Sequence, residues 1–326
     1  MKRFRTFALA AAVAVACAPW VAGGVAAQPF PSKPIRIIAP VPPGGGVDIL
    51  SRTLGQKVGD LLGQPVVVEN KPGGNGNIGF DLAAKSPPDG YTLVMSYSAV
   101  ATNVSLHDKL PYDPEKDFAP VVFVGYIPLI LVTNPESGIT SVKDLIAKAK
   151  AKPGAIQYAH GGTGAGAHLS GELFRHLTGA QVEPISYKGN APALTDVIAG
   201  HVPIMWDTIN TSLPQVKAGK LKALATTGRQ RSPLAPDVPT MIEAGVPDFE
   251  ISAWYMILAP KKTPADVVQK LNAAVNQAIK DPEVAGKLVP QGVDFVGGTP
   301  TQADEFLRSE IDRWGKLIKA NGIRAE

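Results

Sequence analysis

Two glycine-rich loops are the part of this sequence best suited to binding chemistry, because each can hold an anion with its backbone amides. They span residues 42–48 and 161–166. Glycines let a ligand approach the backbone closely. A loop that ends where a helix begins presents free N–H groups, backed by the positive end of the helix dipole. The sequence therefore predicts two anion-receptive loops.

The two loops occupy the same place in a repeated local pattern. In the first, the strand-like run 35–39 leads through the loop and a helical pattern to the run 65–69. In the second, 156–159 leads in the same way to 182–185. A strand, a helix and a second strand in this order form a βαβ unit. Two such units in different halves of the chain indicate two lobes that grip one small anionic molecule.

Further candidate ligand contacts follow neighbouring strands. The segment 74–79 fits the dinucleotide pattern G-x-G-x-x-G only weakly, because it follows the second strand and lacks a suitably placed acidic residue. We expect it to border the same site as a third backbone-amide loop. Residues 96–103 offer hydroxyl and amide donors, with ordinary turn chemistry as the alternative. The predicted ligand-binding residues are Pro43, Gly44, Gly45, Gly46, Asp48, Gly76, Gly79, Ser96, Ser98, Asn103, Thr163, Gly164, Ala165, Gly166, His168, Tyr187 and Asp207.

Several of these side chains also have a purely structural interpretation. Asp48 can cap its helix and pair with Arg52 one turn on, which would make its loop an ordinary tight turn. Tyr187 either places its hydroxyl at the ligand or is half-buried in the fold. Asp207 either holds a water or a ligand amine, or caps a helix. His168 either contacts the ligand or is a capping or packing residue.

The sequence offers little for an enzyme or a metal site. It contains neither a G-x-S-x-G elbow nor an H-E-x-x-H motif, and nothing supplies a nucleophile with an adjacent base. His168 and His176 would lie about 12 Å apart along a helix, too far to share one metal. We therefore expect no catalysis, no cofactor and no metal. A hydrolase or lyase on the same scaffold stays open, and it would show turnover rather than stoichiometric binding.

The first residues have the pattern of a leader. A basic start at residues 1–5, a short apolar run at 7–16 and small residues at 25–27 predict a signal peptide over 1–27 and export to the periplasm. Cys17 raises lipidation as a rival, although the residues before it fit a lipoprotein signal poorly. Without the leader the chain has no cysteine and loses three of its four net positive charges. We therefore expect no binding to nucleic acid or to a membrane surface.

Apolar strand-like runs alternate with helical patterns along the rest of the chain, which predicts an α/β fold with mainly parallel sheets flanked by helices. We expect a discontinuous first lobe, residues 28–125 plus 251–326, and a second lobe at 126–250. The chain would then cross twice between the lobes. Two crossings form a hinge, and a hinge lets two lobes close around a ligand.

Many ordered motifs of this chain match one known family. The matching segments are 33–38, 43–48, 70–79, 88–93, 112–118, 164–174 and 187–189. With these segments the chain resembles the Bug-type extracytoplasmic solute receptors, the substrate-binding proteins of tripartite tricarboxylate transporters. The resemblance implies a two-lobed periplasmic binding fold, type II-like and of the Venus flytrap kind. It also implies a carboxylate ligand held by loop amides, hydroxyls and waters rather than by an arginine clamp.

The resemblance also implies partners. We expect a monomer that delivers its ligand to the membrane permease subunits of a tripartite tricarboxylate transporter; the alternative is a sensor that presents the bound carboxylate to a signalling partner. The ligand can be a dicarboxylate, a tricarboxylate, an amino acid or an aromatic acid. The scarcity of charged side chains at the predicted site argues against a highly charged ligand such as citrate.

Overall fold

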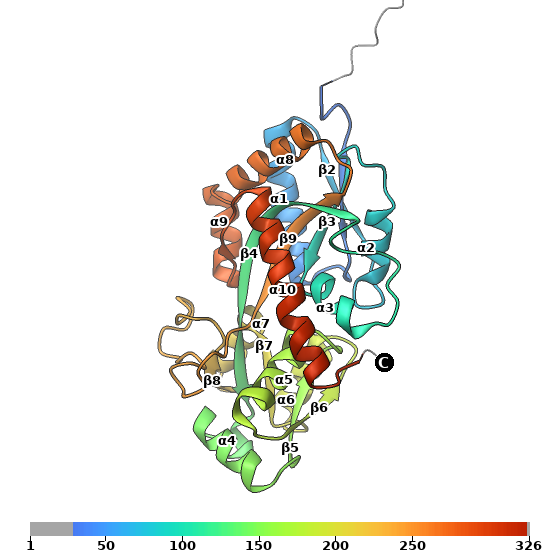
Figure 1. Ribbon diagram of the computed structural model, residues 1–326. Helices are drawn as coiled ribbons and strands as arrows, with labels where there is room; N and C mark the ends of the chain where they lie inside the picture. The colour runs from blue at the N-terminus through green and yellow to red at the C-terminus, as the bar shows by residue number, and fades with distance from the viewer. Residues whose placement is uncertain (1–28, 325–326) are drawn as a thin grey trace, which may run out of the picture.

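The computed structural model describes residues 29–324, so the predicted signal peptide and Cys17 lie outside the described part. Within that part, strands from both halves of the molecule join in one ten-stranded sheet, in the order β2-β1-β3-β9-β4-β7-β5-β6, with β8 and β10 paired to β4. Figure 1 shows an elongated molecule in which the two halves lie end to end. The two lobes therefore share one continuous sheet instead of having two separate ones.

The first half contains a parallel βαβαβα unit. Strand β1 pairs in parallel with both β2 and β3, so it lies between them. Each strand is followed directly by a helix, which is the arrangement that the strand-like runs and glycine loop predict. The elements are β1 (Ile35–Ala39), α1 (Gly46–Leu62), β2 (Val66–Asn70), α2 (Asn77–Ala84), β3 (Thr92–Tyr97) and α3 (Ala99–Leu106).

The second half repeats this unit with the same strand order. Strand β5 pairs in parallel with β6 and β7, so β6-β5-β7 corresponds to β2-β1-β3. The echo between the two glycine loops therefore reflects equivalent positions in two copies of one topology. The elements are η1 (Pro135–Ser137), α4 (Val142–Ala151), β5 (Ile156–His160), α5 (Gly166–Thr178), β6 (Val182–Ser186), α6 (Asn190–Ile198), β7 (Ile204–Thr208), α7 (Ile209–Lys217) and β8 (Lys222–Thr226).

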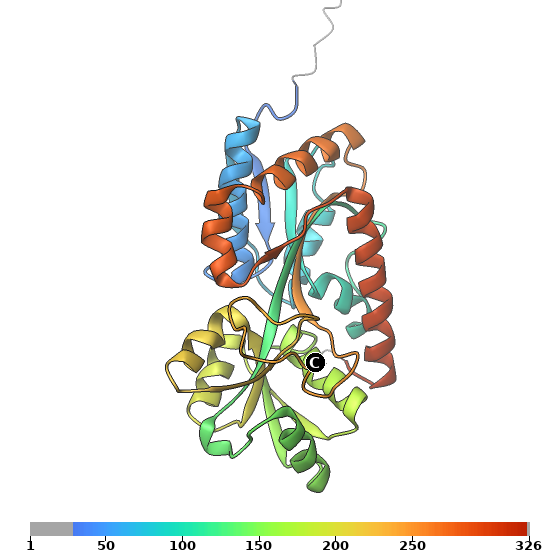
Figure 2. The same cartoon turned by 90° about the vertical axis from the view of Figure 1, so that its left-hand side faces the viewer.

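Two long antiparallel strands join the halves. β4 (Phe118–Thr133) pairs with β9 (Ser252–Pro260) over its first part and with β7 and β8 from Leu129 onward. Figure 2 shows β4, in green, running from one half into the other beside β9. The short β10 (Asp294–Phe295) pairs with β4 at Gly125. A Cβ on Gly125 would lie 2.2 Å from the Asp294 carbonyl oxygen, so this close approach requires glycine.

Helices cover both faces of the sheet. On one face a single apolar cluster runs through both halves, with Leu54 of α1 and Val197 of α6 among its members. The other face carries two clusters, one around Phe80 of α2 and one around Phe174 of α5. The remaining elements are α8 (Ala265–Ala278), α9 (Pro282–Leu288), η2 (Val289–Gln291) and α10 (Pro300–Ala320). No helix among residues 29–324 is both long and apolar enough to cross a membrane.

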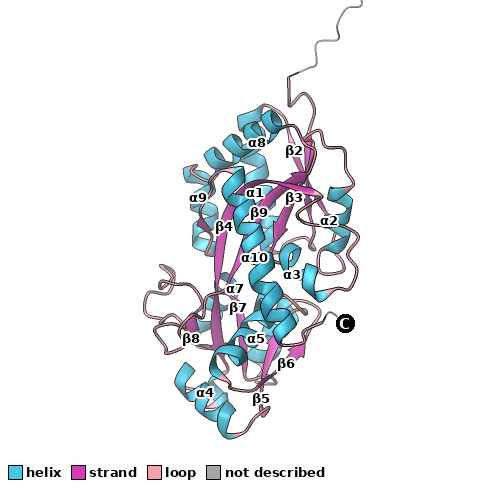
Figure 3. Cartoon of the chain, in the orientation of Figure 1, coloured by secondary structure: helices cyan, strands magenta, loops and turns pink. Residues whose placement is uncertain are grey.

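Helix α10 spans the junction between the halves, as Figure 3 shows. Leu307, in its first half, packs in the cluster of the first half, whereas Trp314 and Leu317 pack in that of the second. Between them, the buried Glu310 carboxylate accepts hydrogen bonds from the indole N–H groups of Trp254 and Trp314, each at 2.8 Å. One carboxylate therefore ties together tryptophans from both clusters.

Replacing Glu310 with alanine is expected to lower the free energy of unfolding by about 3 kcal/mol, because two buried indole N–H groups lose their acceptor. Denaturant unfolding followed by tryptophan fluorescence measures this directly. Glu305→Ala, an exposed position on the same helix, is the matched control and should change stability little. Equal effects of the two substitutions would contradict a role for Glu310 in joining the clusters.

Candidate functional site

The predicted ligand loops lie where the two halves meet. In each half the carboxyl ends of the parallel strands lead directly into helix N-termini, the place where open α/β sheets bind ligands. Two hydrogen bonds, each 3.5 Å long, connect the halves there. The Asn75 amide donates to the Thr163 carbonyl oxygen, and the Thr102 hydroxyl donates to the Gly164 carbonyl oxygen. The second glycine loop therefore lies directly against the first half.

Asp48 holds the first glycine loop in place. Its Oδ2 accepts the Gly44 N–H at 2.9 Å, its Oδ1 accepts the Asn70 amide at 2.8 Å, and both oxygens contact Arg52. Burial opposes ionisation of Asp48, but the hydrogen bonds from Arg52, Gly44 and Asn70 outweigh it and lower the pKa of the carboxyl. The expected pair with Arg52 is present, and the Asp48 oxygens are already used by protein donors.

The loop nevertheless leaves amides free for an anion. Pro43 and Gly44 form the turn before α1, Gly45 is the N-cap residue, and no side chain caps the helix. The N–H groups of the first helical turn have no acceptor within the helix. Gly45 has extended backbone, with φ −81° and ψ 169°. The N-terminus of α1, from Gly46 onward, therefore has the donors that a carboxylate requires.

Two tyrosine hydroxyls lie beside the starts of α1 and α2, and the sequence analysis predicted neither of them. A Cβ on Gly46 would lie 3.3 Å from Tyr255 Oη, and one on Gly76 would lie 2.9 Å from Tyr97 Oη. Tyr97 and Tyr255 face each other in the β3–β9 register. Burial raises the pKa of Tyr255 to about 12 and also raises that of Tyr97, so both stay neutral donors. Tyr97 could have been found because it follows a predicted strand, but Tyr255 depends on the pairing of β9.

Asn103 organises the third loop. Its buried amide donates to the Asn75 carbonyl at 3.0 Å and to Asn77 Oδ1 at 2.7 Å, and its own Oδ1 accepts from the Asn75 amide at 2.9 Å. Gly76 is the N-cap of α2 with φ 87°, a conformation that favours glycine. The Asn103 side chain therefore acts on the loop 73–77, and through it on the start of α2.

The other small residues of this half divide by environment. Gly79 allows close packing, because a Cβ there would lie 2.6 Å from the Pro40 side chain. Ser98 is the N-cap of α3 and makes no capping hydrogen bond. The Ser96 hydroxyl is buried and bonds to no described residue. Ser96 and Ser98 thus have donors to offer, whereas Gly79 serves the contact between α2 and Pro40, the residue after β1.

Two histidine rings hold the second glycine loop in place by accepting hydrogen bonds from its backbone N–H groups. His160 Nδ1 accepts the Gly162 N–H at 3.3 Å, and His168 Nδ1 accepts the Gly164 N–H at 3.2 Å. The loop passes through Thr163 and Ala165 to Gly166, where α5 begins. Ala165 is the N-cap, with φ −70° and ψ 160°, and it has no side-chain cap. The start of α5 therefore matches the start of α1, including its uncapped amides.

Buried His168 is expected to make stability depend on pH. Burial, aided by Arg175, lowers its pKa to about 4, so the folded protein keeps this ring neutral in acid where an unfolded histidine is charged. As pH falls from about 6.5 towards 4, the unfolded state alone takes up the proton, and folding loses up to about 3 kcal/mol. Chemical denaturation at a series of pH values measures this loss.

Two variants separate the effect of His168 from that of its neighbours His160 and Glu172. His168→Asn keeps an acceptor for the Gly164 N–H but cannot be protonated in this range, so the fall in stability between pH 6.5 and 4 should become shallower. His176→Asn, at an exposed position two turns further along α5, should keep the wild-type slope. An unchanged slope in His168→Asn would show that another group carries the effect.

Tyr187 and Asp207 both bond to groups within the second half. The Tyr187 hydroxyl donates to Asp196 Oδ2 at 2.7 Å. Asp207 is fully buried and accepts hydrogen bonds from Thr211, Ser212 and Asn190 at 2.5, 2.8 and 3.3 Å. Burial raises the pKa of Asp207, and these hydrogen bonds oppose that rise. These two side chains thereby hold α6 and α7 in position. The N-termini of both helices lie at the same junction.

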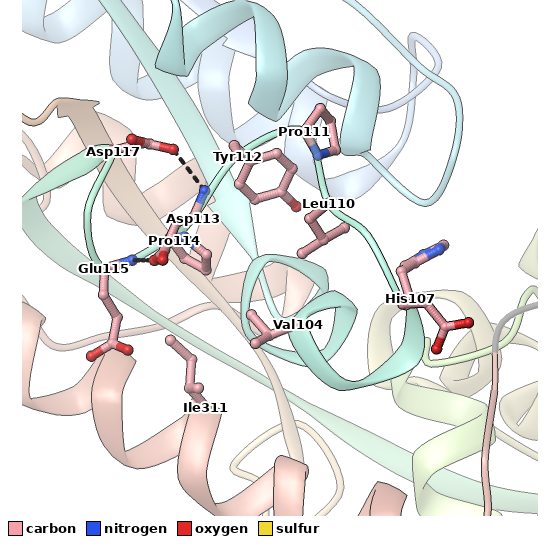
Figure 4. Close-up of a pocket in the computed structure, with 11 residues that line it drawn as sticks. Val104, His107, Leu110, Pro111, Tyr112, Asp113, Pro114, Glu115, Asp117 and Ile311 are labelled. Carbon is pink, nitrogen blue, oxygen red and sulfur yellow. Dashed lines mark hydrogen bonds between the residues drawn. The ribbon is translucent and has the colours of Figure 1, made fainter.

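A separate hollow of about 470 Å³ lies at the end of α3, between the loop 107–117 and α10 (Figure 4). Four carboxylates line it. Asp117 accepts the Asp113 N–H at 2.7 Å, and Glu115 pairs with Arg308, so much of this charge is used to shape the loop. An acidic lining repels anions. The hollow is therefore a poor site for the anionic ligand that the glycine loops predict.

Comparison with known proteins identifies the family of the chain. A family model described as the tripartite tricarboxylate transporter family receptor matches residues 50–323. BugT of Bordetella pertussis is 40% identical over 306 residues, which cover 93% of this chain and 94% of BugT.

Two solved structures are similar over nearly their whole length. A protein of R. palustris solved with adipate has 34% identity and a TM-score of 0.83, covering 90% of this chain and 99% of that one. MatC from Rhodopseudomonas palustris, with bound malate, has 30% identity and a TM-score of 0.78, covering 89% and 100%. The expected two-lobed binding-protein fold is confirmed. The chain belongs to the family of tripartite tricarboxylate transporter receptors, which are substrate-binding proteins rather than enzymes.

Proposed function

We propose that this receptor captures a small carboxylate between its two halves and delivers it to the permease of a tripartite tricarboxylate transporter. The observation that carries the proposal is the meeting of uncapped helix N-termini from both halves at one junction. The similar structures that contain adipate and malate support a carboxylate, and the dicarboxylate class in particular.

The charges at the junction support recognition by amides and hydroxyls. Arg52, the cation beside the first loop, is bonded to Asp48 and Asn70, and Lys71 pairs with Glu69. A ligand carboxylate would therefore be held by helix N-termini and by neutral hydroxyls, such as those of Tyr97 and Tyr255. A highly charged ligand would lack enough cations to neutralise it.

The predicted contacts form our proposed ligand-binding set, with different roles. The amide donors would be those of Gly45, Gly46, Thr163 and Gly166, because the N–H groups of Gly44, Gly164 and Ala165 already bond to Asp48, His168 and Gly162. The hydroxyl donors would be Ser96, Ser98 and the two tyrosines. Asp48, Asn103, His168, Tyr187 and Asp207 would hold these donors in position, since each already makes a hydrogen bond within the protein. Closure over the ligand would exclude water and strengthen every dipole at the junction.

We further propose that the lobes are residues 28–125 plus 251–326 and residues 126–250, hinged on β4 and β9. The switch of β4 from pairing with β9 to pairing with β7 supports this division. The last turns of α10 pack on the second lobe, so closure would have to preserve or rearrange that contact. The exported, monomeric form would begin near Gln28.

A thermal-shift screen of residues 28–326 tests the proposal. The protein is first unfolded and refolded to remove any copurified ligand, and is then screened against organic acids, with sugars and amines as controls. A ligand at 100 times its dissociation constant should add about 2.7 kcal/mol of stability, which clearly raises the melting temperature. Stabilisation by carboxylates alone supports the proposal. Stabilisation by sugars or amines, or by nothing in the panel, contradicts it.

A further inference from the structure

A second pocket, of about 370 Å³, lies behind the second glycine loop. Residues of α5, of β6 and of the chain end beyond α10 line it. Figure 1 shows this chain end leaving α10 near α5 and β6. The pocket is thus on the α5 side of the second half. It shares Thr163 and His168 with the proposed ligand-binding set, Thr163 as a contact of the loop and His168 as the residue that holds the Gly164 amide. The lining residues are His160, Thr163, His168, Glu172, Arg175, Pro184, Ile185, Ser186, Asn321, Ile323 and Arg324.

One buried polar side chain of the pocket, that of His168, has a ring nitrogen that can bind an occupant. His168 is only 6% exposed, and its Nδ1 is occupied by the Gly164 N–H. Since Nδ1 acts as the acceptor, the proton of the neutral ring is on Nε2. No other residue of the described chain bonds to Nε2. His168 therefore has a donor available to an occupant of the pocket that it lines.

The charge balance of the lining favours an anion. Both Glu172 oxygens are bonded to Arg175, and one of them also accepts from the Tyr158 hydroxyl. The charges of Glu172 and Arg175 therefore cancel each other, whereas Arg324 has no ion-pair partner within residues 29–324. Thr163, Ser186 and Asn321 add further donors. No cluster of His, Cys, Asp and Glu in the described chain is arranged to hold a metal ion, so these histidines do not indicate a cation.

We propose that this pocket is a second binding site of the protein, selective for a small oxyanion. His168 Nε2–H and the Arg324 guanidinium are its main donors, and the hydroxyls of Thr163 and Ser186 assist them. The occupant fixes the His168 ring and thereby the Gly164 amide that the ring holds. The site thus supports the second glycine loop at its Gly164 amide.

The test titrates the chain 28–326 with inorganic phosphate, sulfate and acetate, followed by calorimetry and by ¹⁵N NMR of the histidine rings. The three probes distinguish a phosphate-like occupant from a carboxylate. Binding should shift the His168 Nε2 resonance and leave that of exposed His176 unchanged. Arg324→Glu reverses the charge of an exposed side chain, and should weaken binding of the oxyanion at least tenfold without altering the fold.

A cross-check separates this site from the carboxylate site. Gly45→Val alters the first glycine loop in the other half, so it should leave oxyanion binding and the His168 shift unchanged. If Gly45→Val abolishes binding of the probes and Arg324→Glu does not, the probes occupy the carboxylate site and the second site is refuted. Absence of any His168 shift at saturating probe, or equal binding in wild type and Arg324→Glu, also refutes it. The proposed function does not depend on these outcomes.

Discussion

Gly45→Val is expected to abolish carboxylate binding and leave the fold intact. The backbone at Gly45 is extended, a conformation that valine adopts readily, and the atom nearest to a Cβ there is the Pro42 carbonyl oxygen at 3.9 Å. The protein therefore has room for the side chain. Valine is a poorer N-cap residue than glycine, so the free energy of unfolding should fall by about 1 kcal/mol at most.

Binding should suffer far more than stability. The branched side chain would stand beside the free amides of α1, where the carboxylate must approach. Losing two charge-assisted hydrogen bonds, each contributing about 1.5–3 kcal/mol, weakens binding by more than about a hundredfold. Calorimetric titration with the carboxylate found in the thermal-shift screen measures the change, and circular dichroism checks the fold.

Gly286→Val is the matched control, because Gly286 is exposed on α9 and a Cβ there meets no atom within 4 Å. This variant should bind like wild type. Normal binding by Gly45→Val would place the ligand away from the first glycine loop and remove the main support for the proposed site.

Local patterns in the sequence predicted the framework of the site. The glycine loops lead into helices that begin at Gly46 and Gly166, and the two βαβ units are present in corresponding positions. These features depend on short-range rules: strand runs, glycine at turns, and the helical pattern that follows. The Asp48–Arg52 pair was also predictable, because residues four apart on a helix are neighbours.

Contacts between distant segments were beyond such rules. Tyr255 reaches the start of α1 only because β9 pairs with β3, and Asn103 engages a loop almost thirty residues earlier in the chain. Likewise, a helical pattern locates α10 but does not show that Glu310 joins tryptophans from two clusters. The pattern of apolar residues predicts which face of a helix is buried. The residues that pack against that face depend on the assembled fold.

Gly161 illustrates the same limit, because its function is steric and was not among the predicted contacts. A Cβ there would lie 2.1 Å from Asn190 Oδ1, 2.5 Å from the Asn190 nitrogen and 2.6 Å from the Gly189 carbonyl carbon. The Gly189 N–H also donates to the Gly161 carbonyl at 3.1 Å. The loop after β5 and the start of α6 are therefore in direct backbone contact, which only glycine permits.

Gly161→Ala is accordingly expected to damage both stability and binding. Two of the three clashing atoms belong to the backbone, so α6 must move, and the Asn190 bond to buried Asp207 is lost with it. Overpacking of this kind costs about 3 kcal/mol or more, which denaturant unfolding will detect. Because the second glycine loop shifts with α6, carboxylate affinity should fall by at least about tenfold.

Gly45→Ala provides the comparison, since the same added methyl group in the equivalent loop of the first half meets no atom closer than 3.9 Å. Its stability should stay close to that of wild type. The two loops thus keep glycine for different reasons: in the proposed site Gly45 would leave space for a ligand, whereas Gly161 leaves space for another part of the chain. If Gly161→Ala is as stable as Gly45→Ala, the contact between the β5 loop and α6 is not the constraint that the geometry indicates.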